Sequence, residues 1–441
     1  MLSFFMLLIT HYSGEPCGLL GPQRVATYLS KLLSYPVIVI GLKRGFNFQK
    51  FLRYLEEHYR NREKIILFSY HCGRPDIFEL ARVLKTLNYR LVLGGPQAQK
   101  DAKGEPNVER YSHRIKGLLE IFNLVYSGPV DGMDIATLCK KEGLVLKEWE
   151  ISVGVTVDWH NFYSFDEGLK KVHVKEAQVL RSIGCPYALK TKSIRVDPPN
   201  FIPDIGEIEI ETSGCSFCDV AWDKGYKGTL KDEKVFEQIE NLPEIEGKKI
   251  PFELIDEYPL SFLPKLLAYV QSQKIRLMQI NLVLRADDIL KNCKLLERSL
   301  FEMGRLKVKL LLSSVGFESF SDRILKNLNK GITASENLAA IRIMRELKKN
   351  YPDVFFYARQ EGANHGFIHP TPWDSEITRA EIQSAIGAYD LTKDILPHHS
   401  TPLIIHHGCA LGEWLRKIEE RHSFVFGRQT NIIEWWEWKR D

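Results

Sequence analysis

The chain has 441 residues, of which 44% are hydrophobic and 26% charged, and its formal net charge is +4. This length exceeds one ordinary hydrophobic core and predicts two domains plus connections. The nearly balanced charge gives no sign of a nucleic-acid or membrane partner, the eight scattered cysteines are unlike a secreted disulfide framework, and no apolar run could span a bilayer, so we expect a cytoplasmic protein.

Residues 1–143 alternate apolar runs with amphipathic segments. The first run lacks the basic flank and the cleavage site of a signal peptide, so we interpret it as a strand. Strands separated by helices of this length form parallel sheets, which predicts a doubly wound, Rossmann-like α/β domain. The expected strands are Phe4–Thr10, Pro36–Ile40, Lys64–Phe68, Arg90–Leu93 and Asn123–Tyr126, and the expected helices are Pro22–Leu33, Phe48–His58, Asp76–Leu87 and one from Met133.

Glycines and polar residues follow the carboxyl ends of these strands, where parallel sheets bind their ligands. Glycine lets the backbone approach a bulky ligand closely, while hydroxyl and amide groups supply hydrogen bonds. A simple turn is the alternative interpretation of Gly-Gly-Pro. The residues concerned are Ser69, Tyr70, Gly94, Gly95, Pro96, Gln97, Ser127 and Gly128.

Residues 144–205 are expected to connect the two domains. Glu148–Val157 alternates like a strand, the spacing in Phe165–Arg181 favours an amphipathic helix, and prolines after Asp197 indicate an extended linker. Within this connection Cys185 stands in Gly-Cys-Pro-Tyr. A metal ligand and a buried structural thiol are equally good interpretations of it.

Cys215 and Cys218 form a C-x-x-C pair in a loop after an expected strand at residues 208–210. Two thiolates at this spacing can bind one soft centre, either zinc or an iron–sulfur cluster. A redox pair and two buried structural thiols are the alternatives.

Residues 206–400 repeat a strand and helix order that predicts an open or closed parallel barrel with functional groups at its strand ends. The expected strands are Phe252–Glu257, Leu277–Leu284, Lys307–Ser314 and Asp353–Ala358, and the expected helices are Asp232–Asn241, Pro264–Gln273, Ala286–Asn292, Lys294–Arg305 and Ser335–Lys348. Polar residues stand at successive strand exits, namely Asp256, Glu257, Arg285, Glu318 and Ser319.

The segment Ile-Glu-Thr-Ser-Gly-Cys-Ser-Phe-Cys-Asp resembles the cluster loop at the first barrel strand of radical S-adenosylmethionine (radical SAM) enzymes, and the later strand ends resemble the same family in order. This resemblance implies that the strand at residues 208–210 is the first strand of the barrel. That family holds its cluster with C-x-x-x-C-x-x-C, and the first of these cysteines is missing from the loop here. Leu-Val-Leu-Gly-Gly-Pro-Gln resembles the cobalamin-binding domain that precedes many radical SAM modules. The cobalt-ligating motif Asp-x-His-x-x-Gly is absent, so His11 is not assigned to cobalt.

The resemblance implies a Rossmann-like domain of cobalamin-binding type followed by a partial (β/α)6 TIM-like radical SAM barrel. It implies a 4Fe-4S cluster at Cys215 and Cys218 with Cys185 as the best third ligand, S-adenosylmethionine at the five strand-exit residues of the barrel, and cobalamin at the eight strand-end residues of the first domain. A small-molecule or peptide substrate and an electron donor such as ferredoxin or flavodoxin would be the partners.

The implied activity is methyl transfer to an unactivated carbon. The alternatives are a radical SAM enzyme without cobalamin that performs another rearrangement, and a degenerate binding protein that lost its third cluster cysteine.

Residues 401–441 form an expected C-terminal extension. Histidines at 398, 399, 406 and 407 together with Cys409 are compatible with metal binding, but adjacent residues of a strand point to opposite faces, so we favour a structural or substrate-pocket role. Trp435, Trp436 and Trp438 are expected to pack against the barrel.

Overall fold

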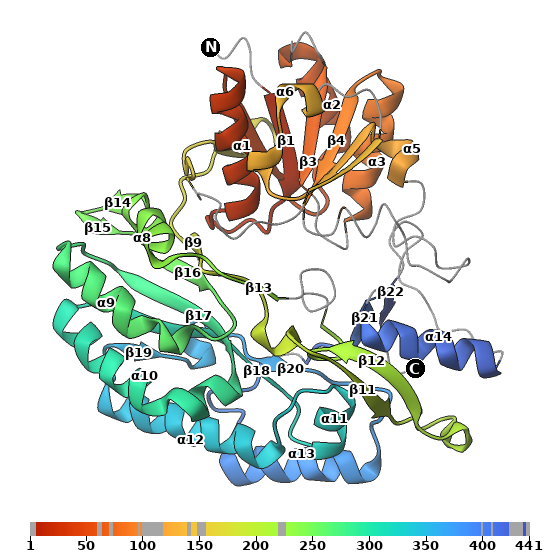
Figure 1. Cartoon of the computed structure of the whole chain (residues 1–441), viewed down its shortest axis with the longest axis vertical. Coiled ribbons are helices and arrows are strands. Elements are labelled where there is room, and N and C mark those ends of the chain that lie inside the picture. The colour runs from red at the N-terminus through yellow and green to blue at the C-terminus, as the bar shows by residue number, and fades with distance from the viewer. Residues whose placement is uncertain are drawn as a thin grey trace. The chain divides into compact units, whose positions relative to one another are not determined.

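The computed structural model describes residues 6–59, 64–69, 74–95, 98, 118–138, 143–147, 156–218, 226–397, 400–406, 409–422 and 435–437. The chain divides into two compact units. The first consists mainly of Met1–Gln178 with Glu233–Pro243, and the second mainly of Val179–Asp232 with Glu244–Gln429. Figure 1 shows the elements of both. No helix among the described residues is long and apolar enough to cross a membrane.

The first unit contains an eight-stranded sheet in the order β6-β5-β4-β3-β1-β2-β7-β8 (Figure 1). All neighbouring pairs are parallel except β7 and β8. The strands are β1 (Met6–His11), β2 (Val37–Leu42), β3 (Ile65–Ser69), β4 (Arg90–Gly94), β5 (Leu124–Ser127), β6 (Gly143–Leu146), β7 (Phe162–Phe165) and β8 (Leu169–Lys171).

The order reverses at β1, which lies between β2 and β3, and this makes the sheet doubly wound. All five expected strands are present within a few residues of their expected limits, and β6, β7 and β8 extend the sheet beyond residue 143. The helices are α1 (Leu20–Leu33), α2 (Phe48–His58), α3 (Pro75–Thr86) and the short α5 (Leu118–Ile121) and α6 (Ile135–Leu138).

The helix expected over Phe165–Arg181 is wrong. This segment forms β7, β8 and β9 (Ala177–Leu180) instead. Val172, Val174, Ala177 and Val179 are buried while residues 173 and 175 are exposed, so most of the apolar positions follow a period of two, which is the period of a strand. Most of the strand expected over 148–157 lies outside the described residues.

The second unit contains a six-stranded sheet in the order β19-β18-β17-β16-β9, with β20 paired to β18. The strands are β16 (Phe252–Ile255), β17 (Gln279–Arg285), β18 (Lys309–Glu318), β19 (Phe355–Phe356) and β20 (Gly366–Phe367). The pairs from β16 through β18, and those of β18 with β19 and β20, are parallel. This is an open, partial barrel of strand and helix repeats, as the sequence predicted.

The helices of this repeat are α8 (Asp232–Glu240), α9 (Leu263–Ser272), α10 (Ala286–Leu306), α11 (Asp322–Asn327), α12 (Ala334–Asn350) and α13 (Glu376–Tyr389). Most of α8 groups with the first unit by its contacts. The two helices expected over 286–305 form the single helix α10, which departs from helical geometry at Asn292, with φ −119° and ψ 21°. There the Asn292 amide donates to the Asp288 carboxylate at 2.7 Å.

The strand that precedes the cysteine pair, β12 (Ile208–Ser213), does not join the parallel sheet. It pairs in antiparallel fashion with β11 (Thr191–Val196). Its isoleucines are buried, whereas the glutamates at 207, 209 and 211 are exposed. A strand with only one buried face suits a two-stranded antiparallel ribbon better than a parallel sheet covered on both faces. The expectation that it is the first barrel strand is therefore wrong.

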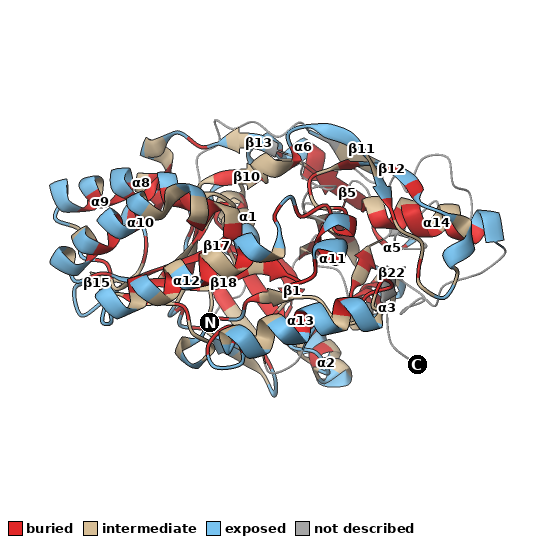
Figure 2. Cartoon of the chain, turned by 90° about the horizontal axis from the view of Figure 1, so that it is seen from below, coloured by how far each residue is buried: buried red, intermediate tan, exposed pale blue. Residues whose placement is uncertain are grey.

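The C-terminal residues add α14 (Ala410–His422) and an antiparallel pair of short strands, β21 (Ile404–His406) and β22 (Trp435–Glu437). α14 packs on the ribbon, where Lys417 donates to the Glu209 carbonyl at 2.9 Å. Most residues of α14 that face the interior are buried, as Figure 2 shows by colour. The residues at 398, 399, 407 and 438 and the side chains of Trp435 and Trp436 lie outside what the structure describes.

The linker that follows Asp197 is hydrogen-bonded to the rest of the second unit. The indole N–H of Trp373, which is fully buried, donates to the Asp197 carbonyl at 2.9 Å. The Asn200 backbone N–H donates to the Pro372 carbonyl at 3.0 Å. Trp414 packs against Trp373 with ring centroids 5.5 Å apart, and its own buried indole N–H has no hydrogen-bond partner among the described residues.

We predict that Trp373→Phe destabilises the protein more than Trp414→Phe. Both substitutions remove similar volume, but only the first leaves a buried carbonyl without its donor, which costs roughly 1–3 kcal/mol. Denaturant titration of the two variants measures the difference. Equal losses of unfolding free energy would show that the Asp197 bond contributes nothing.

Candidate cluster and cofactor site

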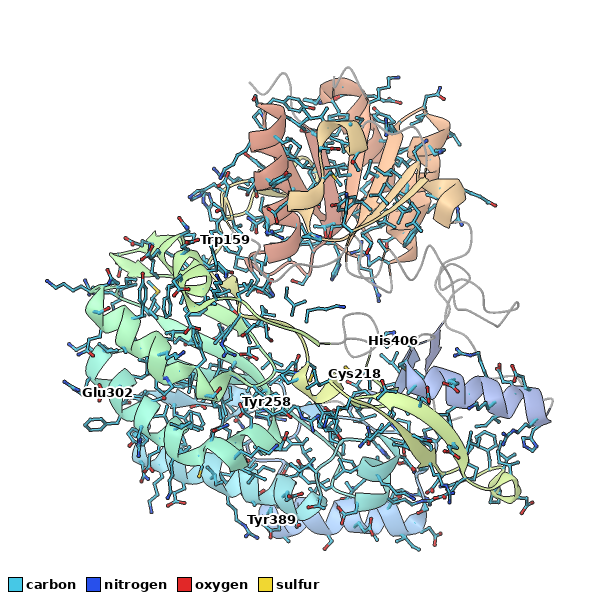
Figure 3. All side chains as sticks on the ribbon, in the orientation of Figure 1. Trp159, Cys218, Tyr258, Glu302, Tyr389 and His406 are labelled. Carbon is cyan, nitrogen blue, oxygen red and sulfur yellow. The ribbon has the colours of Figure 1, made fainter. Side chains whose placement is uncertain are left out.

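The C-x-x-C loop is fixed at its centre. The Cys218 backbone N–H donates to the Cys215 carbonyl at 3.1 Å, so the two half-buried cysteines flank one turn. Ser216 between them is fully buried; its backbone N–H donates to the Leu328 carbonyl and its hydroxyl to the Asn327 carbonyl. Its own carbonyl accepts the Leu411 N–H of α14 at 3.0 Å. Figure 3 labels Cys218 in this loop.

A buried cation lies against the loop. Arg285, at the carboxyl end of β17, is 4% exposed and donates from Nη1 to the Cys215 sulfur at 3.2 Å. Its Nε donates to Asp287 Oδ1 at 2.9 Å, and its Nη2 to the Lys330 carbonyl. Burial lowers the pKa of Arg285, but the charges of Cys215 and Asp287 outweigh it and raise this pKa above its usual range. The guanidinium therefore stays charged beside the Cys215 sulfur.

Cys185 lies near Cys215 and Arg285 in space. It stands between β10 (Ser182–Gly184) and the short helix η3 (Pro186–Ala188), and β10 pairs with β13 (Tyr226–Thr229). Burial, followed by the charges of Glu257 and Cys215, raises the pKa of Cys185 to about 11. The fold thus brings Cys185 within electrostatic range of the loop, although the two are well separated in sequence.

These thiols fit an iron–sulfur cluster in their chemistry. Cys185, Arg285 and Lys330 all lie within electrostatic range of Cys215, and the two cations would offset the negative charge of a thiolate-bound cluster. In the described ranges no three His, Cys, Asp or Glu side chains surround one point closely enough to hold a metal ion as they stand.

The five strand-exit residues come from the ends of β16, β17 and β18, at one edge of the parallel sheet. Asp256 pairs with Arg181 and accepts the Tyr258 N–H, Arg285 contacts Cys215, Glu318 pairs with Lys330, and Ser319 accepts the Ser321 N–H. Glu257 is half-buried and contributes to the raised pKa of Cys185.

Lys330 is a site residue that sequence reasoning did not select. It is 4% exposed, and its ammonium contacts Glu318 Oε1 at 2.9 Å. Burial lowers the pKa of Lys330, but the charge of Glu318 more than compensates and raises it. A Cβ at Gly316 would lie 2.6 Å from the Lys330 ammonium, so glycine makes room for the pair. The turn Asn-Lys-Gly was the available signal in the sequence.

Asp288 is a second residue that the sequence reasoning did not select. It is fully buried at the start of α10, where it accepts from the Asn292 amide and the Leu260 N–H. Burial raises the pKa of Asp288 to about 6. Its neighbour Asp287 has a lowered pKa, because Arg285 and Lys291 outweigh the effect of burial. Adjacent carboxylates thus prefer opposite protonation states.

At the carboxyl edge of the sheet in the first unit, Arg74 lies next to His11. Arg74 is 2% exposed; its Nη1 lies 2.6 Å from His11 Nδ1 and donates to the Leu42 carbonyl, and it pairs with Asp76. Burial, followed by the charges of Arg74 and Arg44, lowers the pKa of His11. His11 is therefore neutral, with one ring nitrogen engaged.

The residues expected to bind cobalamin lie at the ends of three adjacent strands, because Ser69 is in register with Gly94, and Gly94 with Tyr126. A Cβ at Gly94 would find its nearest atom at 3.8 Å, so the backbone there is open to a ligand. Gly128 differs: a Cβ there would lie 2.7 Å from the Lys147 carbonyl, so the chain itself requires this glycine. Tyr70, Pro96 and Gln97 lie outside the described residues.

No protein-family model and no curated protein matches the sequence. Among solved structures, the chain is similar to the apo, selenomethionine-labelled structure of OxsB, a cobalamin-dependent S-adenosylmethionine radical enzyme, with a TM-score of 0.53 and 12% sequence identity. The chain has the fold of a cobalamin-dependent radical SAM enzyme. The match covers 98% of this chain but 64% of that one, so this chain spans about two thirds of its length.

We predict that Gly128→Ala destabilises the first unit while Gly94→Ala does not. The φ of Gly128 is +136°, and its Cβ would press on Lys147, so the cost should exceed about 1 kcal/mol. Denaturant melts of both variants test this. A Gly128→Ala protein as stable as Gly94→Ala would contradict the close approach of Lys147.

We predict that Asp288→Asn changes stability in a pH-dependent way. The folded chain holds the Asp288 proton more tightly than the unfolded chain, so the resulting stabilisation is complete below about pH 4 and is lost as the pH rises through about 6. Between these pH values the unfolding free energy of Asp288→Asn should therefore rise relative to that of the wild type, by at most about 3 kcal/mol.

Asp287→Asn is the matched control, because the lowered pKa of Asp287 makes its contribution present at neutral pH and lost in acid. Unfolding free energies measured from about pH 2 to pH 8 should move in opposite directions relative to the wild type as the pH rises: Asp287→Asn falls behind below about pH 5, whereas Asp288→Asn gains between about pH 4 and 6. Parallel pH profiles for the two variants would contradict the opposite pKa shifts of Asp287 and Asp288.

Proposed function

We propose that this protein is a radical SAM enzyme that uses a 4Fe-4S cluster, S-adenosylmethionine and cobalamin to transfer a methyl group to an unactivated carbon. The observation that supports the proposal most strongly is the contact of buried Arg285, at the carboxyl end of β17, with the Cys215 sulfur, with Cys185 within electrostatic range of both, in a chain with this fold. The substrate would be a small molecule or a peptide, and ferredoxin or flavodoxin would supply electrons.

A 4Fe-4S cluster bound with S-adenosylmethionine supplies the electron that splits a carbon–sulfur bond and gives a 5′-deoxyadenosyl radical. Cys185, Cys215 and Cys218 would hold the cluster. Arg285 offsets the negative charge of the thiolates. The Lys330–Glu318 pair offers both signs of charge beside them, which suits the ammonium and carboxylate of an amino acid.

The first unit would bind cobalamin without a histidine on cobalt. Gly94 and Gly95 at the end of β4 leave the backbone accessible, and His11 is engaged by Arg74. We therefore expect the base-off form.

A non-catalytic binding protein is the second candidate. The observation that favours it is that the charged residues expected to hold S-adenosylmethionine are already paired inside the protein, Asp256 with Arg181 and Glu318 with Lys330. Such a protein would keep these pairs and use the same edge for another ligand.

Anaerobic reconstitution with iron and sulfide distinguishes the two. We expect about four irons per chain, a paramagnetic resonance signal on reduction, and 5′-deoxyadenosine once S-adenosylmethionine and dithionite are added. Cys215→Ala and Cys218→Ala should lose the cluster. Cys293→Ala, which changes a half-buried cysteine of α10, is the matched control and should keep it. A Cys215→Ala/Cys218→Ala double variant with full iron content would contradict the cluster assignment.

Cobalamin and methyl transfer are tested separately. Protein purified with hydroxocobalamin should retain it at about one equivalent with the absorption of the base-off form. Retention of iron without cobalamin would favour a radical enzyme that performs another rearrangement. A folded protein that binds neither cofactor would favour the non-catalytic alternative.

A further inference from the structure

We propose that Tyr187, stacked on Arg285, is the positioning residue that holds Cys185 beside Cys215. In this way a cysteine from the segment after β10 takes the place of the one that the C-x-x-C loop lacks. The consequence for cluster binding rests on the proposed function, whereas the placement of the two thiols is a property of the protein alone.

One guanidinium joins the two cysteine segments. The Cζ atom of Arg285 lies 4.0 Å from the centroid of the Tyr187 ring, and Nη1 of the same group donates to the Cys215 sulfur at 3.2 Å. A planar cation can stack on an aromatic face and donate at its edge at the same time. Tyr187 is therefore positioned by the residue that contacts Cys215.

The phenol is anchored at its other end. Its hydroxyl donates to the Asn329 carbonyl at 3.1 Å. Asn329 in turn reaches the loop, because its side-chain amide donates to the Gly214 carbonyl, next to Cys215. Tyr187 thus contacts the loop's supports at two points.

Gly331 makes room for this ring. Its φ is +69°, and a Cβ there would lie 2.3 Å from the Tyr187 hydroxyl. Any larger residue at 331 would displace the tyrosine, because both the backbone conformation and the space require glycine.

The position of the Tyr187 ring also constrains Cys185, because the segment that connects them is short and stiff. Pro186 separates Cys185 from Tyr187, and the backbone N–H groups of Ala188 and Leu189 donate to the carbonyls of Cys185 and Pro186 at 2.9 Å and 3.1 Å. Proline fixes one torsion of this turn. Locating the Tyr187 ring therefore also locates Cys185, two residues earlier in the same turn.

The test uses the full chain without metal and in a Cys218→Ser background, so that the neighbouring thiol does not compete. Dibromobimane joins thiols that lie close together, and peptide mapping identifies the Cys185–Cys215 product. We expect this product in the parent, a loss of about fivefold in Tyr187→Ala and in Gly331→Ala, and its retention in Tyr187→Phe, which keeps the stacked ring.

Tyr389→Ala is the matched control, because it removes a similar stack, that of Arg342 over Tyr389 at 4.9 Å between α12 and α13. It should leave the cross-link unchanged. Circular dichroism confirms that each variant is folded.

An unchanged yield in Tyr187→Ala, or no product in the parent, would overturn the proposal. The outcome is independent of the proposed function: a Tyr187-dependent cross-link in a protein that takes up no iron would keep the positioning role and reject the cluster. A cluster that forms equally well in Tyr187→Ala and the parent, with unchanged cross-linking, would keep the cluster and reject the positioning role.

Discussion

The buried charge of Arg285 is the constraint on which the site of the second unit depends. A guanidinium removed from water is costly unless its surroundings compensate it. Here the compensation comes from separate parts of the chain: the sulfur of Cys215, the carboxylate of Asp287, the carbonyl of Lys330 and the ring of Tyr187. The same contacts that stabilise the charge therefore fix the relative places of these segments.

A second buried pair supports the same edge of the sheet. Glu318 has a φ of +63°, a conformation that costs free energy outside glycine, and its carboxylate is held by the ammonium of Lys330. Residues in such conformations cluster at functional sites, where the surrounding structure compensates the strain. The carbonyl of Lys330 also accepts a hydrogen bond from Arg285, so the Lys330–Glu318 and Arg285–Asp287 ion pairs are joined through the backbone of Lys330.

The sequence predicted those parts of the fold whose apolar period is clear. α2 begins and ends where its spacing indicated, and all five strands expected in the first sheet are present. It failed at Phe165–Arg181, where a mixed apolar pattern was taken for a helix, and at β12, whose single buried face was taken for a barrel strand. Both errors concern which surface a segment buries, and that is decided by tertiary contacts.

For the site, motif and strand-end position selected the two loop cysteines, Arg285 and Glu318. They did not select Lys330 or Asp288, because burial, which alone makes these charges unusual, is invisible in the spacing of residues. The nearness of Cys185 to Cys215 likewise follows from a tyrosine and a glycine brought together by the fold, and no interval between cysteines encodes it.

The bond from the Leu411 N–H to the Ser216 carbonyl has a consequence for the order of events during synthesis. One of the supports at the centre of the cysteine loop is supplied by α14, which comes far later in the sequence than the loop itself. A ribosome releases the loop long before it has made that helix. The loop therefore lacks this support until α14 has been synthesised, and it can reach the geometry described here only after that part of the chain is made.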